Sequence, residues 1–327
     1  ASLAIVRVVW PEPVARRRAL GVWASCNGLA FAIGPALGGL LIDRYGWRSV
    51  FFLVVPIALA AALLARLAVP ESADPQGRNL DLAGQVLGAL ALGGFVFAAI
   101  AFRTSGGAWA GALALAALAL FLRVERRGGT AALVPLDLFA QPAFRGAVIA
   151  TAAMTFGIYG MIFLLPLIWQ STGVLTPEQA GLALLPCALV FFAVSQWSGH
   201  LAQRFGVRAM TAGGTAIIGC GLLVVAATAA GRPLPLAEAG LVLAGLGMGL
   251  NTGPLMAVAV DAVTSARSGT ASSLINVARM AGASLGVACL GAAFAGWHGG
   301  AGGLQVAMLA GGCVQLAGAW VAWAMIR

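Results

Sequence analysis

Two long stretches of the chain, residues 146–177 and 209–231, contain no charged side chain. A helix that crosses the hydrocarbon core of a bilayer needs about 20 consecutive apolar residues. The rest of the chain is similar, because 61% of its 327 residues are hydrophobic, 9% are charged and the mean hydropathy is +0.97. A water-soluble domain of this length requires a far more polar surface. The sequence therefore excludes a soluble fold and indicates an integral membrane protein.

Ten apolar runs, bounded by charges, prolines or glycine-rich breaks, predict an all-α polytopic membrane protein with ten full transmembrane helices. The runs cover residues 18–42, 49–69, 82–102, 108–122, 144–169, 179–198, 209–230, 236–258, 270–296 and 304–326. Residues 1–10 resemble the last turns of one further span. The chain begins inside that span without a start methionine or a cleavage site, so we expect the natural protein to begin upstream of Ala1.

The basic residues, which are all arginines, predict which loops face the cytoplasm. One set of alternate loops holds thirteen arginines and the other set holds four. Positive charge accumulates on the cytoplasmic side, so the loop at 10–18, the linker at 70–81 and the C-terminus are predicted to be cytoplasmic. The net charge of +9 does not indicate nucleic-acid binding, because the arginines occur singly or in short clusters between apolar runs.

The first and ninth apolar runs share a pattern of glycines. A shift of 248 residues superposes Gly21, Gly34 and Gly38 on Gly269, Gly282 and Gly286. Glycines four residues apart allow close helix packing, so one interpretation is two ordinary packing faces. The other is an internal repeat, as in transporters whose two bundles rock about a central site. Both helices follow a basic loop, which favours the repeat.

Residues 27–39, Asn-Gly-Leu-Ala-Phe-Ala-Ile-Gly-Pro-Ala-Leu-Gly-Gly, resemble the antiporter motif in span 5 of drug exporters of the major facilitator superfamily. Residues 199–208 resemble the C-lobe copy of that superfamily's cytoplasmic loop motif, with Gln203 at its usual acidic position. The resemblance implies a major facilitator fold. It also implies a hinge, or else a static kink, at Gly34, Pro35, Gly38 and Gly39, and a loop motif that includes Gly199, Arg204, Gly206 and Arg208.

The segment from Gly269 to Gly286 resembles span 13 of the fourteen-span drug:proton antiporters of EmrB/QacA type. The repeated helices lie eight runs apart, whereas a twelve-span repeat would place them six apart. The resemblance thus implies spans 4–14 of fourteen, with an N-terminal truncation. The implied parts are a remnant of the N-terminal bundle (1–69), two extra linker spans (70–143) and a C-terminal six-helix bundle (144–327).

Arg279 is predicted to lie near the middle of its span, about 18 Å from Arg267 along the helix. A charge at that depth is costly unless it faces water or a partner, so it indicates substrate binding or proton-linked work. Asn276 lies one turn earlier and is expected to orient Arg279 or a substrate. The alternative is a structural clamp on helix-end carbonyls. No Asp or Glu lies deep inside a predicted span, so proton coupling is implied by the resemblance alone.

Aromatic and amide side chains in the spans supply further candidates for a substrate cavity. In the family's layout the run 144–169 lines the cavity, where Tyr159, Phe163 and the following Gln170 would contact flat lipophilic cations. The other candidates are Asn27, Gln196 and Asn251. Each of these side chains has an alternative position facing lipid, and Trp169 is expected to anchor the helix at the interface.

The sequence as a whole predicts a secondary active exporter, not an enzyme, in the bacterial inner membrane. Its partners would be the lipid bilayer, a small amphipathic substrate, protons and a periplasmic adaptor protein. The cargo would be drugs, dyes or biocides, with a dedicated metabolite exporter or a non-transporting remnant as alternatives. A channel is disfavoured because no selectivity-loop repeat is present. No cofactor or metal is expected, since the five cysteines lie inside apolar runs without metal-binding spacing.

Overall fold

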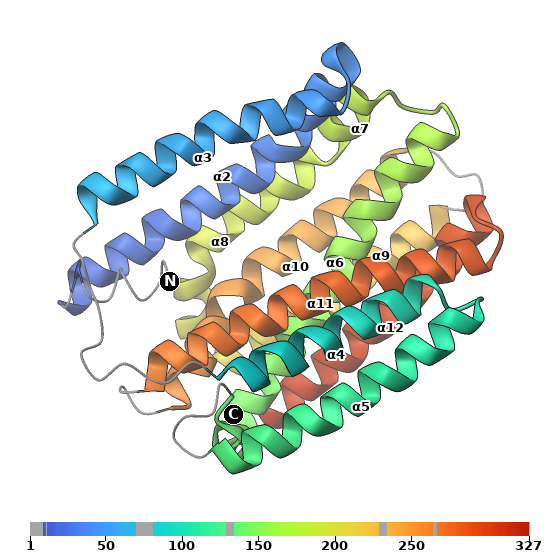
Figure 1. The fold of residues 1–327 in the computed structure, drawn as a ribbon. Helices are drawn as coiled ribbons and strands as arrows, with labels where there is room; N and C mark the ends of the chain where they lie inside the picture. Colours follow the sequence, from blue (N-terminus) through green and yellow to red (C-terminus); the bar gives the residue numbers. More distant parts are fainter. Residues whose placement is uncertain are drawn as a thin grey trace.

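The computed structural model describes residues 9–10, 12–69, 81–128, 134–228, 234–263 and 267–326. Within these ranges every regular element is a helix, which confirms the prediction of an all-α chain (Figure 1). In chain order the elements are α2 (Pro13–Tyr45), α3 (Arg48–Ala68), α4 (Leu82–Ile100), α5 (Ser105–Gly128), the 3-10 helix η2 (Leu136–Ala140), α6 (Pro142–Ser171), α7 (Pro177–Ala183), α8 (Leu185–Phe205), α9 (Val207–Thr228), α10 (Leu234–Asp261), α11 (Ser268–Gly296) and α12 (Gly300–Met325).

Among the described residues, nine helical segments are long and apolar enough to cross a membrane, with α7 and α8 counted together as Pro177–Phe205. These nine correspond to nine of the ten predicted runs. The remaining predicted run, 18–42, lies within α2, which is 33 residues long. The side chains of residues 13–25 and 27 in that helix lie outside the described part of the chain. The number of ten full spans therefore stays a prediction.

Three predicted boundaries were wrong. The loop expected at 10–18 is helical from Pro13 onward, because the fixed φ of proline suits the first helical turn. The run 108–122 was predicted too short, because α5 continues through Arg126 and Arg127. The flexible side chains of these arginines reach water from the helix end. The run 179–198 is divided at Leu184, because Pro186 lacks the N–H that would continue the helix.

Two similar turns connect α2 to α3 and α8 to α9. Each contains an arginine, an aromatic residue and then a glycine with positive φ, which is 79° at Gly46 and 85° at Gly206. In both turns the glycine N–H donates 2.9 Å to the carbonyl oxygen four residues earlier. Side chains other than glycine rarely adopt this backbone conformation, so the glycine ends one helix and lets the next begin at once.

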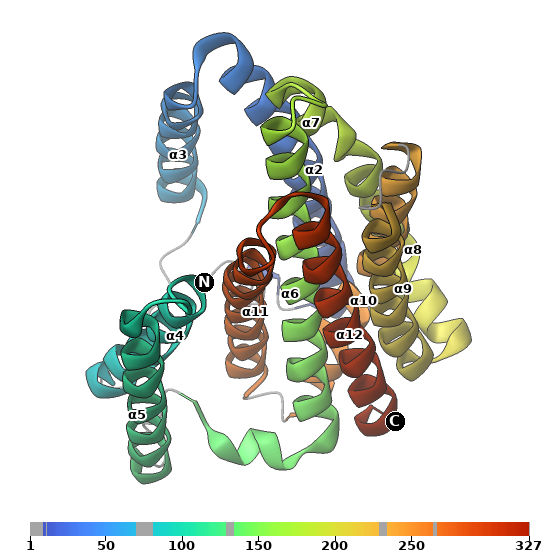
Figure 2. The ribbon, with the colours of Figure 1, turned by 90° about the vertical axis from the view of Figure 1, so that its right-hand side faces the viewer.

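The centre of the fold is α6, which packs against α9, α10, α11 and α12 (Figures 1 and 2). Its side chains at Met154, Ile158, Met161, Leu164 and Leu165 are fully buried and join one apolar cluster with residues of those helices. In contrast, α3 has no buried residue. An apolar helix exposed on nearly all sides is expected where lipid is the solvent.

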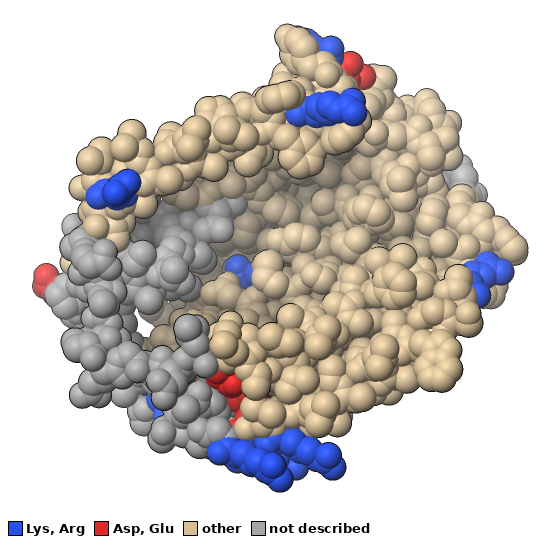
Figure 3. All heavy atoms as spheres, in the orientation of Figure 1, with Lys and Arg blue, Asp and Glu red and all other residues tan. Residues whose placement is uncertain are grey.

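The helices outside this bundle attach to it at two places. The hairpin of α4 and α5 packs against α11 through α4, whereas α2 packs against α7 and α8 on another side. The surface is hollowed between the edge formed by α2 and α3 and the edge formed by α11 and α4, with a basic side chain on the floor of the hollow (Figure 3). The candidate site residues of α6 and α11 lie between these two edges.

Candidate transport site

The predicted hinge makes a close contact with α7. A Cβ atom on Gly39 would collide with the carbonyl oxygen of Pro177, and a Cβ atom on Gly181 would collide with the carbonyl oxygen of Pro35. Glycine on each helix thus faces backbone on the other, which brings the two axes close together. In contrast, a Cβ atom on Gly34 or Gly38 would meet no described atom within 4 Å. The structure therefore brings Pro35 and Gly39 of the motif into the contact.

The same face of α2 continues onto α8. The rings of Phe31 and Phe191 meet edge to face, with centroids 5.7 Å apart. A void of only about 10 Å³ is left between Phe31, Pro35, Ile162 and Cys187. Aromatic pairs of this geometry stabilise a contact beyond the apolar area that they bury. The segment of α2 that resembles the antiporter motif is therefore packed tightly against α7 and α8.

Arg279 lies on α11, and its Nε is buried without a hydrogen-bond partner among the described atoms. Tyr159, on the neighbouring helix α6, lies near the guanidinium. Asn276 lies one turn before Arg279, but its Nδ2 donates to the carbonyl oxygen of Ser272 at 3.0 Å. A guanidinium has only donors, so the atom of Asn276 that could orient Arg279 is Oδ1, which this bond does not use.

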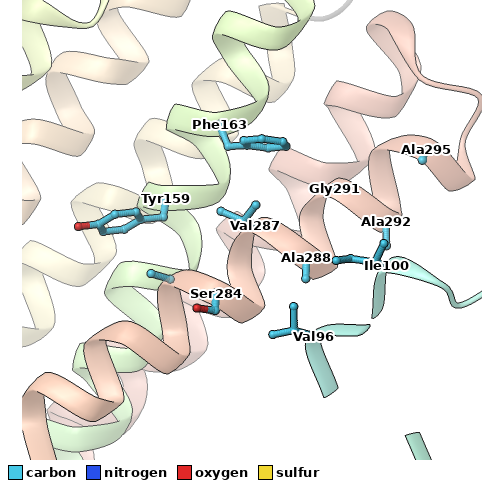
Figure 4. Close-up of a pocket in the computed structure, with 11 residues that line it drawn as sticks. Val96, Ile100, Tyr159, Phe163, Ser284, Val287, Ala288, Gly291, Ala292 and Ala295 are labelled. Atoms are coloured by element: carbon cyan, nitrogen blue, oxygen red, sulfur yellow. The ribbon is translucent and has the colours of Figure 1, made fainter. Parts of the chain in front are cut away.

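A cavity of about 690 Å³ lies between α4, α6 and α11 (Figure 4). The side chains that shape it are Val96, Ile100, Tyr159, Phe163, Ser284 and Val287, with small residues of α11 between them. Two of the predicted candidates, Tyr159 and Phe163, thus line the same space. Gln170 is exposed two turns further along α6 and does not line it.

The remaining predicted candidates lie apart from this cavity. Asn251 is fully buried, and its Nδ2 donates to Thr215 Oγ1 at 3.1 Å, which joins α10 to α9. Gln196 is exposed on α8. The side chain of Asn27 lies outside the described residues. Trp169 was expected at the membrane interface, but it is buried in the apolar cluster because the last turn of α6 packs inside the bundle.

Sequence reasoning missed two features of this region. Gln315 is fully buried on α12, and its Nε2 donates to the carbonyl oxygens of Ala153 and Met154 on α6. An amide in the middle of the apolar run 304–326 was the signal that would have identified it. No such signal identified Val96 and Ile100 of α4, because the residues of that helix are apolar on every face.

The loop motif at residues 199–208 places its arginines at the junction of α8 and α9. Arg208 donates from Nε to the carbonyl oxygen of Trp323 at 2.6 Å, and its Cζ lies 4.2 Å from the centroid of that ring. Arg204 lies over the ring of its neighbour Phe205 at 5.5 Å. Gly206 forms the turn between the two helices, and a Cβ atom on Gly199 would meet no described atom. Arg208 therefore ties this junction to the end of α12.

The acidic groups lie at or near the helix ends. In the described part of the chain, Asp and Glu lie in loops or terminal turns of helices, as at Asp43, Asp81, Glu178 and Asp261. Asp81 caps α4, since its carboxylate accepts a hydrogen bond of 2.8 Å from the N–H of Gly84. Over the same ranges, no three His, Cys, Asp or Glu side chains lie close enough to hold a metal ion.

Comparison with known proteins agrees with this architecture. The profile of the Major Facilitator Superfamily matches residues 1–84 and 80–287. Multidrug resistance protein Stp of Mycobacterium tuberculosis is 33% identical over 303 residues, which cover 90% of this chain and 56% of Stp. Drug efflux pump JefA of the same organism is 33% identical over 308 residues, which cover 92% of this chain and 60% of JefA.

A third relative is the methylenomycin A resistance protein of Streptomyces coelicolor, which is 30% identical over 337 residues. That alignment covers 99% of this chain and 69% of the relative. This chain thus spans a little more than half the length of Stp and JefA. The profile match covers most of the chain, and the helices have the length and composition of membrane spans. The chain therefore belongs to the Major Facilitator Superfamily, a family of multi-pass membrane transporters rather than enzymes.

Proposed function

We propose that this chain forms part of a secondary active exporter of amphipathic drugs, dyes or biocides that works by alternating access. The observation that carries the proposal is the contact of α2 with α7, where Gly39 faces Pro177 and Gly181 faces Pro35. Alternating access requires two groups of helices that tilt against each other. A contact of glycine against backbone, beside a proline that interrupts the helical hydrogen bonds, suits such movement.

The division of the chain supports the same proposal. Residues 1–69 would belong to the N-terminal bundle and residues 144–327 to the C-terminal bundle. The hairpin of α4 and α5 lies between them in the chain and packs on α11, as an additional pair of spans would. This position favours the fourteen-span branch of drug:proton antiporters. The excess of arginine in alternate loops favours a bacterial inner-membrane protein with a cytoplasmic C-terminus.

Proton coupling is the part of the proposal for which the described spans supply no acidic group deep in the membrane. A proton-coupled carrier needs a group that titrates within the membrane. The described spans carry their acidic side chains at helix ends, as at Asp43 and Asp261. Proton coupling is therefore inferred from membership of the family, whose drug transporters typically use protons.

The test is efflux of amphipathic dyes, both anionic and cationic, from bacterial cells that lack their own major exporters and express the gene that encodes this chain. Faster efflux than in cells with an empty vector, abolished by a protonophore, is the expected result. If the chain reaches the membrane and no dye of a broad panel leaves faster, the exporter proposal is wrong.

A matched pair of variants connects transport to the contact. Gly39→Val introduces a side chain against the Pro177 carbonyl, whereas Gly38→Val places the same side chain where no described atom lies within 4 Å of the Cβ. Gly39→Val is expected to reduce efflux strongly at equal expression, and Gly38→Val is expected to retain it. Equal loss in both variants would argue against a role for this contact.

A second candidate function is export of a single compound. The methylenomycin A resistance protein, which is named for one antibiotic, covers 99% of this chain. A panel of ten or so unrelated amphipathic dyes and antibiotics, scored by resistance of the expressing cells, distinguishes the two candidates. Resistance to several compounds supports the multidrug exporter, and resistance to one supports the dedicated exporter.

A further inference from the structure

We propose that the cavity between α4, α6 and α11 binds the apolar body of an anionic amphiphile, and that Arg279 binds its anionic group. The inference rests on the proposed function, because it names the substrate class of that exporter. It differs from the expectation of lipophilic cations. It also gives α4, one of the extra spans, a direct part in binding.

The cavity has the size and lining of a site for an aromatic body. Its volume of about 690 Å³ lies within the range of roughly 300–1,000 Å³ that is usual for small-molecule sites. Apart from the hydroxyl groups of Tyr159 and Ser284, the lining side chains are apolar. The ring of Phe163 extends over the cavity from α6, while Ile100 and Val96 close it from α4 (Figure 4).

Arg279 lies one turn before Ala283, the first residue of α11 that lines the cavity. Ala283, Val287 and Gly291 follow it at intervals of four residues, and all three line the cavity. Residues four apart lie on one side of a helix, about 6 Å along its axis. Tyr159, which lies near Arg279, lines the cavity and points its hydroxyl away from α4 (Figure 4). The backbone of Arg279 therefore lies one turn beyond the apolar part of the site.

The electrostatics of this region favour an anion. The guanidinium of Arg279 is half-buried, and its Nε donor has no described partner. The described acidic side chains lie at or near helix ends, so the middle of the described spans supplies no carboxylate to pair with it. A carboxylate or sulfonate would satisfy the donor with a charge-assisted hydrogen bond, because guanidinium presents a planar fork to such groups. A cationic head group at the same place would be repelled.

The test is binding of two tritiated probes that share one ring system to the purified, immobilised chain. The probes are 1-anilinonaphthalene-8-sulfonate, which carries an anion, and N-phenyl-1-naphthylamine, which is neutral. We expect the anionic probe to bind more tightly, and Arg279→Gln to weaken it by about tenfold while the neutral probe changes little. Arg279→Lys is expected to restore part of the difference. Unchanged binding of the anionic probe to Arg279→Gln would overturn the inference.

Two pairs of variants test the cavity itself. Gly291→Leu fills it from α11, where a Cβ atom would meet nothing within 4 Å, and Val96→Trp fills it from α4. Both are expected to weaken both probes. Their controls are Val277→Trp on α11 and Val86→Trp on α4, which replace exposed valines outside the cavity. If the fillers and the controls bind equally well, the probes bind elsewhere and the inference is wrong.

The experiment also distinguishes two possible sources of the anion, and it distinguishes a failure of this inference from a failure of the proposed function. A short-chain phosphatidylglycerol that displaces the anionic probe identifies a membrane lipid as the natural amphiphile, whereas a lack of displacement identifies a soluble one. Binding is measured without transport. If dye efflux is absent but the anion binds, the exporter proposal is wrong and this inference holds. If dye efflux occurs but Arg279→Gln does not change binding, this inference is wrong and the exporter proposal holds.

Discussion

The side chain of Gln315, on α12, donates hydrogen bonds from Nε2 to the backbone carbonyl oxygens of Ala153, at 2.8 Å, and of Met154, at 2.9 Å, on α6. A Cβ atom on Gly157, one turn later, would collide with the same amide. Gln315 therefore lies against the backbone of α6 at the point where a glycine leaves room for it. The contact fixes α6, the central helix of the bundle, against α12 from within the apolar core.

Gln315→Glu is expected to destabilise the protein by about 3 kcal/mol or more, because a buried carboxylate would face two carbonyl oxygens and has no proton to donate. Gln315→Met removes the hydrogen bonds but keeps the shape, so we expect a loss of only about 1 kcal/mol. Thermal unfolding of the detergent-purified variants, followed by size-exclusion chromatography, measures both. Equal stability of the two variants would mean that Gln315 contributes packing alone.

The contact of α11 with α6 gives a second prediction. A Cβ atom on Gly286 would collide with the carbonyl oxygen of Phe156, whereas one on Gly269 would meet no described atom within 4 Å. Gly286→Ala is therefore expected to cost about 1–3 kcal/mol, as overpacking of a close contact does. Gly269→Ala, at the start of the same helix, is expected to be neutral or to stabilise by up to about 1 kcal/mol. Melting curves that shift equally in both variants would contradict the assigned contact.

The positions of the helices could largely be predicted from the sequence, because lipid requires long uncharged runs whose length is set by the bilayer. The run 49–69, for example, is α3 at Arg48–Ala68. The predicted run 82–102 begins directly after Asp81, which caps α4. The break at Leu184 was not predicted, although Pro186 was the residue that signalled it. Apolar composition alone hides such a break, since both pieces read as one hydrophobic run.

The contacts between helices could not be predicted in the same way. When every face of a helix is apolar, periodicity does not show which face meets protein and which meets lipid. Tyr159 and Phe163 were candidates because they are large and aromatic, yet Val96 and Ile100 line the same cavity without any distinguishing pattern. Similarly, the glycine pairs found by the 248-residue shift do not make equivalent contacts, because Gly286 packs on α6 whereas Gly38 faces no described atom.

The contact between Arg208 and Trp323 leads to a third prediction. Arg208 makes both a hydrogen bond and a cation–π contact with Trp323, and Arg208→Lys keeps the charge but removes the Nε donor and the planar face. We expect faster amide hydrogen exchange over the last turn of α12 in this variant. Arg204→Lys is the control, since Arg204 lies over its own neighbour Phe205. An exchange rate that changes as much in the control would show that this contact does not hold α12.

The ion pair between Arg267 and Asp137 gives the last prediction. It joins the start of α11 to η2, just before α6, at the end of the bundle that the arginine pattern predicts to be cytoplasmic. Both side chains are exposed, at 46% for Arg267 and 62% for Asp137, so water and salt screen their attraction.

A double-mutant cycle of Arg267→Gln and Asp137→Asn is therefore expected to give a coupling energy of about 0.2–1 kcal/mol at low salt and close to zero in ~1 M salt. The measurement is thermal stability of the four proteins at both salt concentrations. Arg145, whose guanidinium makes only a 3.5 Å contact with the Phe139 carbonyl oxygen, serves as the control when changed to Gln. A coupling energy well above 1 kcal/mol that persists at high salt would show that the pair is shielded from water, as it would be if a further part of the protein covered this end of the bundle.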